Sequence, residues 1–189
     1  SVDLLLTLKG AEGPERLRLL AYFSPEAPLI CNRLLNQLGE LDGGDCLDAT
    51  YKVPASLRTW LLGNYRPDEQ IREVVESFRI DSKSDINLPL SLDTALRNFD
   101  NGNDSPPLLV FYGDDANAQR ETTLVLAAKQ GMNVLSIDMS NLAQTIDPGE
   151  LFKRALRDAR MLNALPFVMD LDACFEDDHP ATWVGDQLT

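Results

Sequence analysis

LLVFYGDD, residues 108–115, is an unbroken apolar run that ends in a glycine and two acids. A run of this kind is typical of a strand buried on both faces of a parallel sheet. Further strands are predicted at 133–138 and 167–170, and helices at 117–130 and 147–162 separate the three strands. Because alternating strands and helices build parallel sheets, residues 108–189 are predicted to form an α/β half-domain.

A domain linker is predicted directly upstream, at 101–107. Its sequence, Asn-Gly-Asn-Asp-Ser-Pro-Pro, consists of turn formers and prolines that oppose regular structure. Residues 1–100 are therefore predicted to form a domain of their own.

This first domain is predicted to be mostly helical, because apolar residues recur at helical spacing between proline starts and glycine stops. Helices are predicted at 14–23, 24–38, 55–62 and 69–78, with a hairpin turn at 41–47 between short extended pieces. A helix, a glycine turn flanked by short strands and another helix are typical of a winged-helix-like domain. A plain helical packing module is the alternative.

Composition narrows the classes of function. The 189 residues carry a formal net charge of −13, which opposes binding to nucleic acid or to an anionic membrane surface. The three cysteines and the single histidine lack zinc-ligand spacing, and no apolar run approaches the ~20 residues of a membrane span. A cytoplasmic protein is expected. Since Ser1 is not an initiator methionine, a piece of a longer protein is also expected.

The turn after the first predicted strand is where a parallel α/β fold places its ligand. Against the phosphate-loop pattern G-x-x-x-x-G-K-[ST], Gly113 fits the first glycine. Ala118 replaces the second glycine, Gln119 the lysine and Arg120 the hydroxyl residue. The turn therefore lacks the ammonium group that neutralises the β- and γ-phosphates and the hydroxyl that holds Mg²⁺.

Two acids oppose a phosphate at this turn as well. At about 4 Å and an effective dielectric near 20, the repulsion between a phosphate charge and Asp114 or Asp115 is on the order of several kcal/mol. A simpler interpretation is a solvated turn that caps the following helix, where aspartate is favourable without any ligand. We expect the capping role.

The strand at 167–170 ends in Asp170, which stands where a metal-holding aspartate follows such a strand. Leu171 occupies the next position, where ATP-hydrolysing remodellers carry a glutamate that polarises water. Asp172 lies one residue further on and would need a different backbone path.

In this order of motifs the chain resembles AAA+ ATPases that carry two ATPase modules in tandem behind a helical region and a winged-helix-like domain. Besides the strand ends, the resemblance involves VDLLL at 2–6, LAYFSPEAPL at 20–29, Val53-Pro54 and WLLG at 60–63, so it covers nearly the whole chain. It extends to relatives encoded with bacterial contractile injection systems, where the ATPase acts in particle assembly or function.

The resemblance implies a ring-forming remodeller whose first module is degenerate. Gly113, Asp114, Asp115, Gln119 and Arg120 would then be a degenerate Walker A loop, and Asp170 a degenerate Walker B metal position. ATP and Mg would bind a downstream module, no cofactor is expected in this stretch, and the stretch itself is not expected to hydrolyse ATP. The partners implied are proteins or further copies of the chain.

Two other interpretations remain. In a phosphoacceptor receiver domain, Asp114 and Asp115 would hold Mg²⁺ and Asp170 would be phosphorylated, although the spacing between these acids is long for a receiver. In an active ATPase with an unorthodox phosphate loop, Arg120 would clamp the phosphate.

Overall fold

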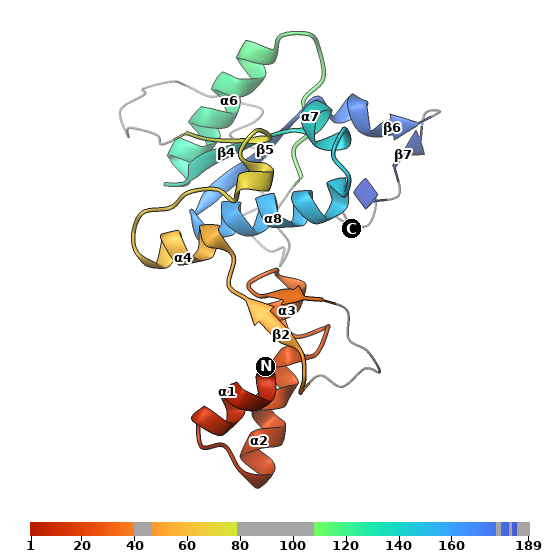
Figure 1. Cartoon of the computed structure of the whole chain (residues 1–189). Coiled ribbons are helices and arrows are strands. Elements are labelled where there is room, and N and C mark those ends of the chain that lie inside the picture. The colour runs from red at the N-terminus through yellow and green to blue at the C-terminus, as the bar shows by residue number, and fades with distance from the viewer. Residues whose placement is uncertain (40–46, 79–107, 177–178, 182, 185–189) are drawn as a thin grey trace.

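The computed structural model describes residues 1–39, 47–78, 108–176, 179–181 and 183–184 (Figure 1). The predicted linker at 101–107 and nearly all of the predicted hairpin turn lie outside these residues. Within the described ranges, no helix is both long and apolar enough to cross a lipid bilayer.

The chain has a mixed α/β fold built on a three-stranded sheet. Its strands are β3 (Val75–Phe78), β4 (Asn133–Asp138) and β5 (Ala164–Met169), in the order β3-β4-β5. Strands β4 and β5 are parallel, with Ile137 opposite Val168, which confirms the two later predicted strands. Strand β3 is antiparallel to β4, with Val75 opposite Ile137, so the sheet is mixed.

The predicted strand at 108–112 is wrong, because these residues form no strand in the structure. Leu108, Val110 and Tyr112 are exposed, and only Phe111 packs against the core, beside Val134. An apolar run is buried on both faces only where a sheet leaves a place for it. Strand β4 has β3 and β5 as its neighbours, and residues 108–112 pair with none of the three strands.

The prediction of a helix at 69–78 is also wrong. A single 3₁₀ turn, η3 (Glu69–Ile71), is followed by a turn at 72–74 and then by β3. The backbone N–H of Asp138 donates to the Val74 carbonyl over 2.9 Å, so the pairing with β4 continues just beyond the strand. Residues 75–78 pair with the edge of β4 although their local sequence has helical periodicity. Strand formation often depends more on the neighbouring strands than on local sequence preference.

The predicted helix at 24–38 is wrong except for one turn inside that range. Only α3 (Pro28–Cys31) forms, and the chain then turns at Arg33, whose φ is +57°. A left-handed residue cannot continue an α-helix. Strand β1 (Asn36–Leu38) follows and pairs antiparallel with β2 (Thr50–Lys52), so short extended pieces do flank the predicted turn.

The other predicted helices are confirmed to within a few residues. They are α2 (Gly13–Leu20) with η1 (Ala21–Phe23), α4 (Ala55–Leu61), α6 (Ala116–Lys129) and α8 (Pro148–Met161). The structure adds α1 (Val2–Leu8), α7 (Met139–Ala143), η4 (Leu171–Cys174) and the short pair β6 (Phe175–Glu176) and β7 (His179–Pro180).

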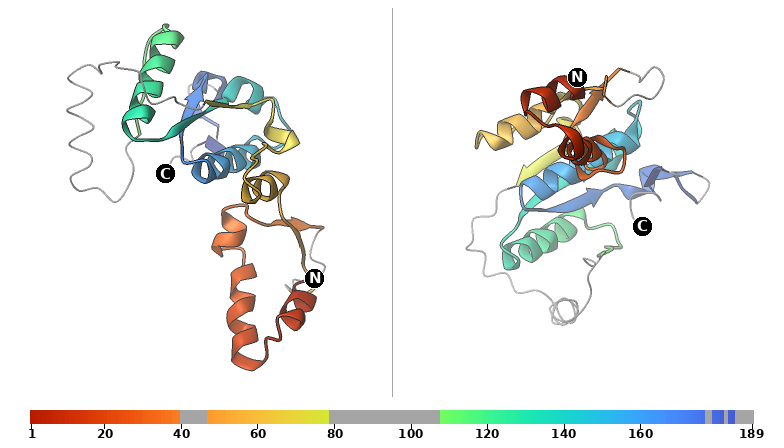
Figure 2. Two further views of the ribbon diagram at one scale, coloured as in Figure 1. Left: turned by 90° about the vertical axis from the view of Figure 1, so that its left-hand side faces the viewer. Right: turned by 90° about the horizontal axis from the view of Figure 1, so that it is seen from below.

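Helices cover both faces of the sheet (Figure 1). On one face Ile137 packs with Phe152 of α8 and with residues of α7, and on the other Val134 packs with Ala127 of α6. Successive β4 side chains point to opposite faces, so the strand is buried on both. A smaller cluster around Leu6 joins α1 to Ala49, and helices α1 and α2 extend away from the α/β body (Figure 2).

Candidate functional site

The predicted phosphate turn is an exposed turn closed by the chain's own groups. The Asp115 carboxylate caps α6 and accepts from the Ala118 backbone N–H over 2.9 Å, so its predicted capping role is confirmed. The Gln119 side-chain amide donates to the Gly113 carbonyl over 2.8 Å. Asp114 is exposed to solvent. The structure therefore brings these residues together, but as a helix cap.

Arg120 is engaged away from the turn. Its guanidinium carbon lies 4.2 Å from the ring centroid of Phe78 at the end of β3. A cation over an aromatic face is attracted by the ring quadrupole. The side chain that could clamp a phosphate is thus bound to the sheet edge.

Asp170 follows β5, as predicted from the sequence. It is exposed, and its backbone adopts the left-handed conformation, with φ of +54°, before η4 begins. Within the described ranges, no hydrogen bond or ion pair joins its carboxylate to residues 113–120. In the same ranges, no group of three or more His, Cys, Asp or Glu side chains is arranged to hold a metal ion.

The main polar cluster of the described structure lies elsewhere, around Arg157 on α8. This arginine is 4% exposed and donates to the carboxylates of Asp68 and Asp158 over 3.1 and 2.8 Å. It also donates to Ser56 Oγ over 2.7 Å and to the Arg33 carbonyl over 2.8 Å. One side chain thus joins α8 to α4, to the segment before β3 and to the turn after α3.

The two acids of this cluster differ in their environment. Burial alone would raise the pKa of Asp68, but the Ser56 backbone N–H at 2.9 Å and the Arg157 guanidinium outweigh it and lower that pKa. Burial raises the pKa of Asp158, and the attraction of Arg157 only partly compensates. Burial and the neighbouring Asp158 raise the pKa of Tyr65, whose hydroxyl donates to Asp158 over 2.8 Å.

Sequence reasoning missed this cluster for a clear reason. Arg157 and Asp158 are adjacent in a helix, where charged residues are usually solvated. Only the neighbouring Phe152, Ala155 and Ala159, all buried, mark this face of α8 as internal. The partner Asp68 is 89 residues away in the sequence, and no local pattern connects the two.

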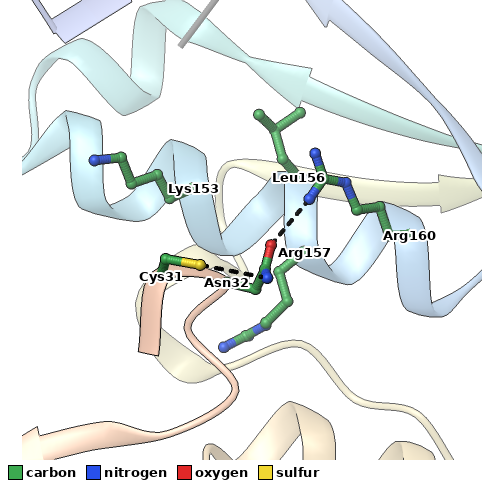
Figure 3. Close-up of a pocket in the computed structure, with 6 residues that line it drawn as sticks. All are labelled: Cys31, Asn32, Lys153, Leu156, Arg157 and Arg160. Atoms are coloured by element: carbon green, nitrogen blue, oxygen red, sulfur yellow. Dashed lines mark hydrogen bonds between the residues drawn. The ribbon is translucent and has the colours of Figure 1, made fainter. Parts of the chain in front are cut away.

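A hollow of about 190 Å³ lies beside this cluster, between α3 and α8 (Figure 3). Its lining residues are Cys31, Asn32, Lys153, Leu156, Arg157 and Arg160. Three of these six are cations, which is unusual in a chain with a formal net charge of −13.

Comparison with known proteins gave no relative: no family model, curated protein or solved structure matches the chain.

Proposed function

We propose that this chain is a non-catalytic, protein-binding part of a AAA+-like remodelling ATPase, acting in assembly or partner binding. The observation that carries the proposal is the turn at 113–120. The groups there that would meet a nucleotide are used by the chain itself: Asp115 caps α6, Gln119 holds the Gly113 carbonyl, and Arg120 lies on Phe78.

Electrostatics at the turn support the same proposal. A triphosphate bound there would approach two carboxylates, Asp114 and Asp115, without a lysine in the position that a phosphate loop uses. The nearest residue able to supply a positive charge, Arg120, would have to leave the Phe78 ring first.

Strand order favours this proposal over the receiver alternative. Receiver domains share the order 2-1-3-4-5, in which the first strand separates the second from the third. Strands β4 and β5 correspond to the second and third strands predicted for residues 108–189, and they are direct parallel neighbours over six residue pairs, from Asn133–Ala164 to Asp138–Met169. No place for residues 108–112 exists between them.

An apolar surface on the N-terminal helices supports the binding role. Leu4, Leu5 and Leu8 of α1 are 57%, 53% and 80% exposed, and Leu17 of α2 is 70% exposed. The same helix α1 is anchored by Val2 and Leu6, which are buried against Ala49. Helix α1 is therefore fixed on one side and offers leucines to a partner on the other, a feature that marks interaction sites.

The finer parts of the proposal follow the resemblance to AAA+ proteins. They are a winged-helix-like N-terminal part that includes the β1–β2 pair, a ring-forming oligomer in the cytoplasm, and ATP hydrolysis in a separate module. The partners are proteins or further copies of this chain.

Calorimetric titration of Mg-ATP into the chain tests the non-catalytic part. We expect no heat beyond dilution and no phosphate release. Micromolar affinity together with turnover would refute the proposal and favour the Arg120 clamp. Trapping of a phosphoryl group on Asp170 with a small phosphodonor, detected by mass spectrometry, would favour the receiver instead.

The leucine surface is tested with Leu8→Glu and Leu17→Glu. Light scattering of the purified chain, or cross-linking of the chain in lysate, should show an assembly. Each of the two substitutions should lower the fraction of the chain that is assembled. Leu62→Glu is the matched control, because Leu62 is 83% exposed at the end of α4, on another helix. Equal loss of assembly in all three variants, or in none of them, would remove the leucine surface from the proposal.

A further inference from the structure

The hollow between α3 and α8 is built on one face of α8. Lys153, Arg157 and Arg160 are four and three residues apart, a spacing that places them on one side of a helix. Asn32, just after α3, lies beside Arg160, and its Oδ1 accepts from the Arg160 guanidinium over 3.2 Å, whereas the amine of Lys153 points away from Asn32 (Figure 3). The exposed thiol of Cys31 lies at the rim, 3.6 Å from the Asn32 amide nitrogen.

The cations of the hollow are not all neutralised. Arg157 is held by Asp68 and Asp158. In contrast, neither Lys153 nor Arg160 makes an ion pair with a described residue. The nearby acid of α8, Glu150, is taken by Arg33 at 2.6 Å and Arg154 at 3.2 Å. Two positive charges around one hollow therefore have no carboxylate partner among the residues that the structure describes.

We propose that this hollow binds a small, multiply charged oxyanion of the phosphate class, with Lys153 and Arg160 on its two sides. These residues are seven positions apart, so their Cα atoms are separated by about 10 Å along the helix. Two long side chains can bridge that distance to a single anion above Leu156. The contact with Asn32 holds the guanidinium of Arg160 at the hollow, which reduces the ordering needed on binding.

A phosphate-class anion fits better than a carboxylate. Two separate cations both gain from a doubly charged ligand, whereas one carboxylate charge gives each of them half the attraction. The volume of about 190 Å³ leaves space for a few atoms attached to the anion, so the source is a free phosphate or a phosphoryl group on a larger molecule. This inference concerns another helix than the turn at 113–120 and does not depend on the proposed function.

The first experiment measures the charge of the hollow through Cys31. Iodoacetate and iodoacetamide both react with the thiolate, so the ratio of their rates at Cys31 cancels the thiolate fraction and reports the local potential. The rates are followed on the Cys31 peptide by mass spectrometry. Loss of one cation should lower the ratio roughly threefold at low ionic strength, and Lys153→Gln with Arg160→Gln should lower it further. Lys9→Gln with Arg18→Gln removes the same charge from α1 and α2 and is the control.

The second experiment measures binding directly. Inorganic phosphate, O-phosphoserine and acetate are titrated into the labelled chain, and amide shifts of residues 153–160 are followed by NMR. Phosphate should bind, acetate should bind at least about tenfold more weakly, and the double variant should lose about tenfold or more in phosphate affinity. If O-phosphoserine binds more tightly than inorganic phosphate, the natural ligand is a phosphoryl group on a larger molecule. If inorganic phosphate binds more tightly, the natural ligand is a free anion.

Three results would overturn the inference. They are no shift with phosphate, equal affinity for phosphate and acetate, and an equal response in the double variant and the α1–α2 control. Thermal unfolding of each variant verifies that the hollow is still formed. If Arg160→Gln alone unfolds the chain, Lys153→Gln still tests the inference through the ratio of the iodoacetate and iodoacetamide rates at Cys31. Lys153 makes no hydrogen bond or ion pair with a described residue, so its replacement should leave the fold intact.

Discussion

The guanidinium of Arg157 lies 3.1 Å from the carboxylate of Asp68, and this buried contact joins α8 to the segment that leads into β3. Neither residue is where chemistry was expected from the sequence. Together they connect residues on both sides of the linker that the sequence predicts at 101–107.

Replacing Arg157 with methionine should destabilise the fold strongly. The change keeps the apolar stem but leaves Asp68 and Asp158 without their shared cation, and Asp158 is fully buried. Removing one partner of a buried ion pair costs about 3–5 kcal/mol, because an uncompensated charge stays inside. Urea unfolding followed by circular dichroism measures this loss.

Arg58→Met is the matched control, because Arg58 is exposed on α4, which the cluster also contacts. Its effect should stay within about 0.5 kcal/mol. If both variants unfolded at the same urea concentration, the cluster around Arg157 would not stabilise the fold as described.

Stability should fall in acid through Asp68. The pKa of this carboxyl is lowered in the fold below its ordinary value of 3.8, so the folded state holds its proton less tightly than the unfolded state. Its contribution is fully present above pH 3.8 and is lost as the pH falls through the lower, folded value. Asp158 has the opposite sign: its pKa is raised, so acidification towards 3.8 relieves an unfavourable buried charge.

Urea unfolding of the wild type and of Asp68→Asn at several pH values separates the contribution of Asp68 from that of Asp158. The pH values run from about 5 to about 2, around the ordinary pKa of aspartate. The variant should be less stable at pH 5, and the difference from the wild type should shrink towards pH 2. A difference that stayed constant over this range would contradict the lowered pKa of Asp68.

Local signals were enough to predict much of this fold. Proline at the start marked α2, α4 and α8, and glycine after the end marked α4 and α6, because caps and helical periodicity act within a few residues. Strand β4 was predicted with the bounds that the structure shows. What could not be predicted is β3, since this strand of four residues forms by pairing with the edge of β4 opposite β5.

The candidate site shows the same division. The cap formed by Asp115 is a contact over three residues, and the sequence predicted it. The stacking of Arg120 on Phe78, the cluster around Arg157 and the hollow all join residues far apart in the chain. No local pattern encodes such contacts, because they depend on how the helices pack onto the sheet.

The two acids of the turn should differ in their effect on stability. Asp115→Ala removes the cap of α6 and should destabilise the fold by about 1 kcal/mol. Asp114→Ala changes an exposed side chain that makes no hydrogen bond or ion pair with a described residue, so its effect should stay within about 0.5 kcal/mol. The urea midpoints of the two variants, each compared with the wild type, measure this difference. A larger effect for Asp114 than for Asp115 would mean that the turn is organised by something other than the cap.

Residues 108–189 should not fold by themselves, although the sequence predicts a separate domain there. The fragment lacks Ile71 and Val74, which are 0% and 4% exposed in the core beside Ile137 and Met139. It also lacks β3, so one edge of β4 loses its pairing.

Burying one such side chain contributes about 1.5–3 kcal/mol, and a whole domain is stable by only about 5–15 kcal/mol. The fragment would lose two of these side chains together with the Asp68 carboxylate that holds Arg157. Thermal unfolding of residues 108–189, followed by circular dichroism, should therefore show no cooperative transition. Their amide NMR signals should show the narrow dispersion of an unfolded chain. The matched control, residues 54–189, restores α4, η3 and β3 and should unfold cooperatively. Equal transitions in the two fragments would place the domain boundary at 101–107 after all, and β3 would then be an addition to a sheet that does not need it.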